Sequence, residues 1–193
     1  MIPFDKLGWA FHNFGYIIYP KYICKNLCDS LQTLPKEAKV LDVGAGTGVL
    51  SHFAKDCRED LKLYAIDPSL GMLKYCKEDI STFKGVAEEL PFDNDSFDTL
   101  LMGEALHHFS DIDKSFQESV RVLKDKGKIF IYDFDPSYLI GKIIAKSEIF
   151  LGEAGNFFKP QDLIKILEKY GFEATLYQYK FRYVIVANLK NKA

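Results

Sequence analysis

Apolar residues along the chain fall into short runs, separated by stretches in which they recur every three or four positions. Short continuous runs favour strands, and the wider spacing favours helices with one buried face. The strand-like runs are 39–43, 61–66, 81–86, 97–102 and 128–133, and helical stretches begin near Val49, Ser69 and Ile112. This alternation predicts parallel strands joined by crossover helices, in an open α/β sheet covered on both faces.

The pattern changes toward the C-terminus. Residues 136–171 turn helical, and the last helix there is predicted to stop at Gly171. Two further runs, 172–180 and 181–189, predict strands that pair as a hairpin, although no Asn-Gly type of turn separates them. No repeat or low-complexity linker interrupts the chain. We therefore expect a single domain over residues 1–193, with a helical insertion at 136–171.

The first 34 residues are rich in aromatic side chains and are broken by Gly8, Gly15 and Pro20. One interpretation is a helical cap that packs on the edge of the sheet. A second is a cap that roofs a ligand site beyond the carboxyl ends of the strands, with Tyr16 and Tyr19 as substrate-binding residues. A third, contact with a membrane surface, is disfavoured because the segment lacks a strong basic face.

A glycine-rich turn follows the first strand. That strand contains Asp42 and continues into Gly44, Gly46 and Gly48, after which a helix begins. Alternate glycines let the backbone approach a ligand where any Cβ would intrude, and the helix N-terminus favours an anionic group. A second acidic residue, Asp67, closes the next strand, where a carboxylate can accept hydrogen bonds from two ribose hydroxyls. The pairing indicates a nucleoside-bearing cofactor.

The spacing of the glycines separates two kinds of cofactor. A dinucleotide fingerprint needs its third glycine one place later, where this chain has Val49. The Asp-x-Gly-x-Gly-x-Gly spacing instead resembles the first motif of class I S-adenosylmethionine-dependent methyltransferases. Later segments resemble the following motifs of that family in the same order; they are residues 67–73, 85–92, 97–109 and 120–131. The resemblance covers residues 40–186 and is greatest to the type 11 branch, which includes the ubiquinone and menaquinone C-methyltransferases.

The resemblance implies a fold and an activity. The fold is a Rossmann-like, doubly wound, mostly parallel sheet of seven strands with an antiparallel C-terminal strand and an N-terminal helical cap. The activity is methyl transfer from S-adenosylmethionine to a small apolar or aromatic acceptor, leaving S-adenosylhomocysteine. In this assignment Asp67 holds the ribose, Asp42 supports the glycine loop and Met72 packs on the adenine. The implied cofactor-binding residues are Asp42, Gly44, Ala45, Gly46, Asp67, Pro68, Met72, Val86, Ala87, Glu88, Met102 and Gly103.

Candidate acid–base groups follow the fourth strand. Glu104, His107 and His108 lie where the acceptor is expected, and such side chains can take a proton from an O–H, N–H or acidic C–H group. Adjacent histidines on a helix start point in different directions, so packing or capping is an alternative role for each. Methyl transfer depends mainly on placing the two reactants in line, and we expect no metal site.

The chain departs from the family pattern at three places. Val86 stands where the family often has Asp, so a contact with the adenine amino group falls to the backbone or to Glu88. Asp-Lys-Gly at 125–127 replaces a Pro-Gly-Gly turn, and Gly-Glu at 103–104 replaces a small or Asn-containing pair. These departures bear on substrate choice more than on cofactor binding.

Composition limits the partners. The 25 basic and 27 acidic side chains give a net charge of −2 and a sequence pI of about 6.1, which provides no field for a polyanion. We therefore expect no nucleic-acid partner. No basic start with a long apolar run opens the chain, and no apolar segment approaches the roughly 20 residues that span a bilayer. The expectation is a cytoplasmic protein without stable membrane insertion.

The four cysteines, Cys24, Cys28, Cys57 and Cys76, form no Cys-x-x-Cys pair, which argues against structural zinc. We interpret them as reduced thiols that behave as small buried hydrophobes. The two other function classes that remain open are a nicotinamide-dependent oxidoreductase and a non-catalytic cofactor-binding regulatory or interaction protein. Val49 and the lack of a Tyr-x-x-x-Lys pair near the fifth strand disfavour the first of these.

Overall fold

A computed structural model describes the chain except for residues 1–8, 10–11, 13–18, 151–154 and 193 and the side chains of 147–149. Its centre is a seven-stranded sheet in the order β3-β2-β1-β4-β5-β7-β6. The strands are β1 (Lys39–Val43), β2 (Lys62–Asp67), β3 (Ser81–Lys84), β4 (Phe97–Gly103), β5 (Leu123–Phe134), β6 (Phe172–Tyr179) and β7 (Arg182–Leu189). The helices are α2 (Lys21–Leu31), α3 (Val49–Cys57), α4 (Leu70–Leu73), the 3-10 turn η1 (Leu106–His108), α5 (Ile112–Val122), α6 (Leu139–Phe150) and α7 (Pro160–Lys169).

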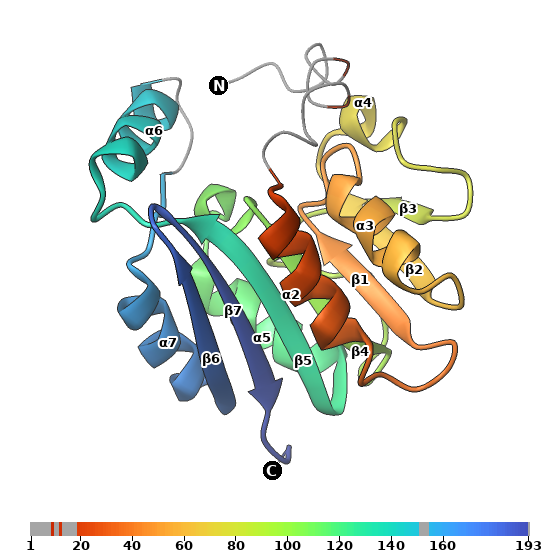
Figure 1. The fold of residues 1–193 in the computed structure, drawn as a ribbon. Coiled ribbons are helices and arrows are strands. Elements are labelled where there is room, and N and C mark those ends of the chain that lie inside the picture. Colours follow the sequence, from red (N-terminus) through yellow and green to blue (C-terminus); the bar gives the residue numbers. More distant parts are fainter. Residues whose placement is uncertain (1–8, 10–11, 13–18, 151–154, 193) are drawn as a thin grey trace.

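Strands β1 to β5 all run parallel to one another. Strand β7 runs antiparallel to its two neighbours, β5 and β6. Helices cover both faces of this sheet, with α2 and α3 on one face and α5 and α7 on the other (Figure 1). Successive side chains of a strand point to opposite faces. In β4, Leu100 therefore packs in the core beneath α5 and α7, while Leu101 packs beneath α2 and α3. The predicted fold class is confirmed.

Two turns place a lysine in the left-handed backbone region that favours glycine. The first of them lies near the start of β5. This strand begins at Leu123, earlier than predicted, because Leu123 pairs with Phe97 ahead of an irregularity in the pairing of β4 with β5. Lys126 in that irregular part has a φ of 59°. Lys180 in the two-residue turn between β6 and β7 has a φ of 55°, which lets the predicted hairpin close without an Asn-Gly pair. Both lysines carry a backbone strain that glycine would relieve.

The described part of the insertion predicted at 136–171 contains two helices of different character. Helix α7 begins with Pro160, buries Leu163 and Leu167, and is followed by Gly171 with a φ of 84°, as predicted. Helix α6 instead exposes much of its apolar surface. In the described parts of the chain, no helix combines the length and the hydrophobicity that crossing a membrane requires.

The expectation that all four cysteines are reduced thiols is wrong for one pair. Cys28 of α2 and Cys57 of α3 form a disulfide, with their Cα atoms 5.3 Å apart, while Cys24 and Cys76 are free. The pairing follows from α2 and α3 lying side by side on one face of the sheet. A search for closely spaced cysteines in the sequence could not reveal it, because 29 positions separate the two residues.

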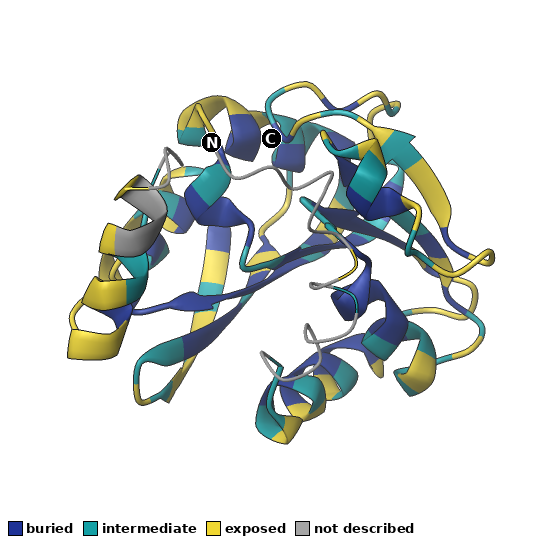
Figure 2. Cartoon of the chain, turned by 90° about the horizontal axis from the view of Figure 1, so that it is seen from above, coloured by how far each residue is buried: buried dark blue, intermediate teal, exposed yellow. Residues whose placement is uncertain are grey.

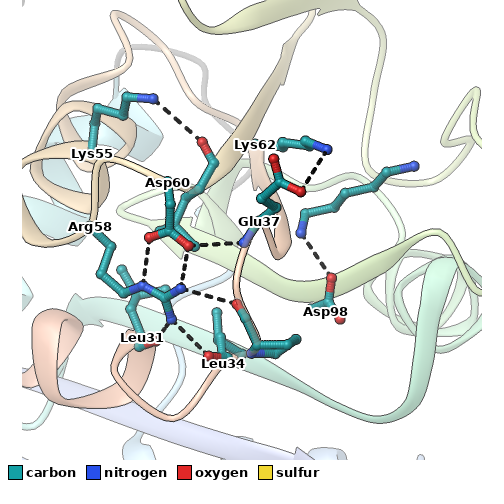
Figure 3. A network of polar contacts seen from close by, with 11 residues as sticks. Leu31, Leu34, Glu37, Lys55, Arg58, Asp60, Lys62 and Asp98 are labelled. Atoms are coloured by element: carbon teal, nitrogen blue, oxygen red, sulfur yellow. Dashed lines mark hydrogen bonds and ion pairs between the residues drawn. The ribbon is translucent and has the colours of Figure 1, made fainter.

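Arg58 joins the end of α3 to the loop that leads into β1 (Figure 3). Its guanidinium donates to both carboxylate oxygens of Asp60, at 3.0 and 2.6 Å, and to the carbonyls of Leu31 and Leu34. The same Asp60 accepts a hydrogen bond from the Glu37 backbone at 2.9 Å. Bonding to Arg58 holds the pKa of Asp60 well below its usual range. This network fixes the edge of the sheet opposite the glycine loop.

Replacing Leu100 tests the position of the core. This side chain is fully buried in β4, so Leu100→Ala should lower the free energy of unfolding by about 2–5 kcal/mol through lost burial and the cavity left behind. The matched control is Leu139→Ala in α6, where the side chain is 74% exposed and the change should be within about 0.5 kcal/mol. Urea unfolding followed by circular dichroism measures both, and equal losses would contradict the assigned core.

Candidate functional site

The candidate site lies at the carboxyl ends of β1, β2 and β4, which meet at one edge of the sheet. The strand order departs from β1 in two directions, to β2 on one side and to β4 on the other. In open α/β sheets this switch point leaves a crevice for ligands. The predicted residues that follow these strands are therefore brought together at the top of the molecule in Figure 1.

The glycine loop needs its glycines. Gly44, Gly46 and Gly48 have φ values of 70°, 54° and 74°. A Cβ on Gly44 would lie 2.6 Å from the Ala105 Cβ, and a Cβ on Gly48 would lie 2.6 Å from the Cys76 Sγ. Both distances are shorter than side-chain contacts allow, so conformation and space together exclude larger residues.

Asp67 connects this loop to the end of β2. Its Oδ2 atom accepts a hydrogen bond from the Gly46 backbone at 2.8 Å, and its Oδ1 atom accepts one from the Ser69 backbone at 2.8 Å. Ser69 in turn caps α4 by accepting from the Met72 backbone. A Cβ on Gly46 would lie 3.3 Å from the Met72 Cε, so Met72 lies against the loop. A carboxylate held by two backbone donors is oriented before any ligand arrives.

Asp42 supports the loop from below. It is buried, and its Oδ2 atom accepts hydrogen bonds from the backbone and hydroxyl of Ser51 at 3.1 and 2.6 Å, in the first turn of α3. Burial raises the pKa of Asp42 to about 7, and the hydrogen bonds from Ser51 oppose that rise. With its carboxylate turned toward the helix, Asp42 positions the loop through α3.

The loop offers acceptors more than donors. The backbone N–H groups of Gly44 and Ala45 donate to the Ile66 carbonyl, and that of Gly46 donates to Asp67. The carbonyls of Gly44 and Gly46 accept no hydrogen bond from any residue that the structure describes. A ligand with a positively charged ammonium group, which only donates, fits such a surface.

The remaining predicted cofactor residues lie in two loops. Val86 is 43% exposed, Ala87 is buried, and Pro68 is exposed beside Asp67. The Glu88 carboxylate accepts from the backbones of Ser110 and Asp111 at 2.6 and 3.1 Å. Glu88 thus fixes the chain just before α5, a contact that its position in the sequence did not indicate.

The predicted cofactor residues Met102 and Gly103, at the end of β4, differ in how far they are exposed. Met102 is fully buried in the core, whereas Gly103 is partly exposed. The Tyr19 hydroxyl donates to the Gly103 carbonyl at 3.2 Å, and its ring lies 5.2 Å from that of Tyr132. Tyr19 therefore lies beside the candidate site, and its role in substrate binding stays a prediction. Tyr16 lies outside the described residues.

Glu104 has an unusual environment. Its φ is 52°, in the left-handed backbone region that Asn tolerates more readily than Glu. Its Oε1 atom is buried and has no hydrogen-bond partner among the residues that the structure describes. Burial and the neighbouring Asp133 raise the pKa of Glu104 to about 8, while His107, Tyr132 and Arg182 oppose the rise. A buried carboxyl with a pKa near the working pH is typical of an acid–base group.

The two histidines lie differently. His107 is buried, and its Nδ1 atom lies 2.9 Å from Asp133 Oδ1 at the end of β5. Its ring stacks on Phe157 at 4.3 Å, and its carbonyl accepts from the Asn156 backbone. His108 is partly exposed. The structure thus joins His107 to a partner, Asp133, that sequence reasoning missed, although an acidic residue at a strand end was the available signal.

A surface pocket lies away from this site. It has a volume of about 480 Å³ and is lined by residues such as Arg121, Tyr170 and Lys192 at the opposite edge of the sheet. Two of its cationic groups are engaged, since Arg121 pairs with Glu118 and Lys192 pairs with Asp95. No predicted site residue lines it.

Comparison with known proteins agrees with the geometry. Residues 41–131 match the model of a family described as a methyltransferase domain of type 11. The UbiE ubiquinone/menaquinone biosynthesis C-methyltransferase of Rickettsia rickettsii is 32% identical over 173 residues, 72% of this chain and 70% of that protein. The demethylmenaquinone methyltransferase of Renibacterium salmoninarum is 38% identical over 109 residues, 55% of this chain. This chain spans 41% and 45% of the first curated relatives it matches.

The crystal structure of YcgJ from Bacillus subtilis superposes with a TM-score of 0.73 at 17% identity, covering 90% of this chain and all of that one. That likeness concerns the fold. Together, fold, glycine loop and sequence matches define the class as that of the S-adenosylmethionine-dependent methyltransferases. Within it, this chain belongs to the type 11 family. The family's cofactor is S-adenosylmethionine, and a glycine cradle with free carbonyls beside an oriented Asp67 fits its methionine and ribose parts.

Asp67→Ala tests the predicted ribose contact. Loss of a hydrogen bond to a charged group should weaken the binding of S-adenosylhomocysteine by about 1.5–3 kcal/mol, or about 10- to 150-fold. Isothermal titration calorimetry measures the change in affinity. The affinity of Asp67→Asn should lie between those of Asp67→Ala and the parent, because Asn keeps one acceptor oxygen. Asp98→Ala is the matched control, since Asp98 pairs with Lys124 at the opposite edge. Unchanged affinity in Asp67→Ala would refute the contact.

Proposed function

We propose that this chain transfers the methyl group of S-adenosylmethionine to a small apolar or aromatic acceptor, with a ring carbon of a phenol or of a hydroquinone, the reduced form of a quinone, as the preferred site. The observation that carries the proposal is the loop after β1, held by Asp67 and shaped so that only glycine fits. The named activities of the Rickettsia and Renibacterium relatives support a ring carbon as the acceptor.

The chemistry asks the protein for placement above all. The sulfonium of S-adenosylmethionine supplies an already electrophilic methyl group. Holding the acceptor in line with the sulfur–methyl bond removes on the order of 7–11 kcal/mol from the barrier. Tyr19, which bonds to Gly103 and packs against Tyr132, is well placed to form an apolar wall for a ring. The aromatic wall would also exclude water from the reacting atoms.

Glu104 is the acid–base group in this proposal. A phenol-type ring becomes nucleophilic at carbon when its hydroxyl loses a proton, and the methylated carbon must afterwards lose its own proton. In this proposal Glu104 takes the hydroxyl proton, returns it to the ring oxygen after methyl transfer, and then removes the proton of the methylated carbon and releases it to solvent. Its raised pKa, and an Oε1 atom without a hydrogen-bond partner among the described residues, suit this exchange. The Tyr132 hydroxyl, which bonds to the carboxylate, keeps Glu104 oriented.

His107 and Asp133 form a positioning pair. Both side chains are almost fully buried, and the stacked Phe157 ring covers the imidazole. Through the Asn156 backbone, which donates to the His107 carbonyl, the pair fixes the segment before α7 against the end of β4. His108 is left as the histidine with access to an acceptor.

The enzymatic proposal is tested by transfer of a labelled methyl group. The chain with labelled S-adenosylmethionine and a set of hydroxylated aromatic acceptors and demethylated quinones kept in their reduced hydroquinone form should yield a labelled product and S-adenosylhomocysteine in equal amounts. Calorimetry should show binding of S-adenosylhomocysteine and none of NAD. Cofactor binding without transfer to any acceptor of this class would favour the non-catalytic alternative, and NAD binding would favour an oxidoreductase.

The role of Glu104 predicts a pH dependence. Because the ionised carboxylate acts as the base, the turnover rate should rise as pH increases through about 8. The turnover rate of Glu104→Gln should be lower and independent of pH over that range. The same raised pKa stabilises the fold below the unfolded-state pKa, and this contribution is lost as pH rises through about 8. Relative to Glu104→Gln, the parent's free energy of unfolding should therefore decrease with pH. Parallel activity profiles of the two proteins would exclude Glu104 as the base.

A further inference from the structure

Helix α6 exposes a row of large apolar side chains. Leu139, Ile143 and Phe150 are 74%, 59% and 91% exposed, and Tyr138 and Ile140 are also largely exposed. Figure 2 shows α6 mainly in the colour of exposed residues. A helix that is apolar over most of its surface is normally buried, and contiguous apolar surface on a protein marks an interaction site.

The apolar row has an ordered border. Residues four and eleven positions after Leu139 lie on the same face of a helix, so Ile143 and Phe150 continue one stripe. Lys142 and Lys146 follow Leu139 by three and seven positions, which places them along one side of that stripe. Both lysines are exposed, and neither forms an ion pair with a residue that the structure describes. An apolar stripe bordered by lysines is typical of helices that lie in a membrane interface.

The first turn of α6 is tightly seated. A Cβ on Gly141 would lie 2.0 Å from the Asp135 carbonyl oxygen, so the helix backbone rests directly on the chain just after β5. The Tyr138 backbone donates to the same carbonyl, and the Asp135 carboxylate accepts from the Ser137 backbone. No other described helix or strand packs extensively on α6. The stripe therefore projects outward from the candidate site edge without a cover from the described chain.

The charge of α6 indicates what covers it. The helix contains two lysines and one acidic residue, Glu148, and is thus positive, whereas the whole chain carries −2. A second copy joined by a symmetric contact would bring the same lysines together, which is unfavourable. Anionic phosphate headgroups above acyl chains match both the lysines and the apolar stripe.

We propose that α6 docks on the surface of an anionic lipid bilayer, with Leu139, Ile143 and Phe150 in the interfacial layer and Lys142 and Lys146 among the headgroup phosphates. The docking itself is independent of catalysis. Its consequence rests on the proposed function: because α6 starts beside the ends of β4 and β5, docking presents the site to an acceptor dissolved in the membrane.

The test is co-sedimentation of the whole chain with vesicles of phosphatidylglycerol and phosphatidylcholine, against vesicles of phosphatidylcholine alone. Binding to the anionic vesicles is expected, with weakening at high salt. Leu139→Ser with Ile143→Ser should reduce it about 10- to 100-fold, and Lys142→Ala with Lys146→Ala about 30-fold. Leu70→Ser, an equally exposed apolar residue of α4, is the matched control and should bind like the parent.

Binding that persists in both double variants, or no binding by the parent, overturns the proposal. Sedimentation velocity adds a direct alternative, since a dimer that the serine variants dissociate would assign the stripe to a second copy. All substituted positions are exposed, so circular dichroism should show parent-like folding. Asp67→Ala separates the two proposals, because it should lose S-adenosylhomocysteine affinity and keep vesicle binding.

Discussion

The hydrogen bonds that Asp67 accepts from Gly46 and Ser69 are the constraint on which the candidate site depends. They join the loop after β1 to the start of α4, although these segments belong to successive crossover units. The adjoining strands only bring the segments to one edge. The carboxylate sets their separation, so that the shape of the cradle is fixed by the fold rather than by a bound ligand. Asp42, which lies in β1 just before the loop, connects it to the following helix α3 by accepting a hydrogen bond from Ser51.

Much of this could be predicted from the sequence, because the decisive signals are local. Alternating runs indicated the parallel strands, and an acidic residue at a strand end indicated Asp67. What the sequence did not indicate depends on contacts between distant segments. The cysteines at 28 and 57 pair only because two helices pack side by side, and Glu88 meets the chain before α5 only in the folded sheet. The left-handed backbone of Glu104 was equally hidden, since the residue type there gives no indication of it.

Polar groups at the ends of β4 and β5 form a second layer behind the glycine loop. The Glu104 Oε1 atom, Tyr132 and the pair of His107 with Asp133 are buried, either at the ends of these two neighbouring strands or in the turn after β4. Burial there is costly unless charges are paired or neutralised. A protonated Glu104 and a hydrogen-bonded His107 satisfy that condition at neutral pH. The same condition makes the region sensitive to any change in one partner.

The position of β7 has a consequence for the synthesis of the molecule. This strand lies between β5 and β6, yet it comes after both in the chain. During translation the growing polypeptide must hold a completed parallel core whose outer strand has open backbone groups, ready to pair with any other extended segment. The open side of β5 can pair only after the β6–β7 hairpin has been synthesised. Termination of translation before this hairpin would therefore release a chain prone to self-association.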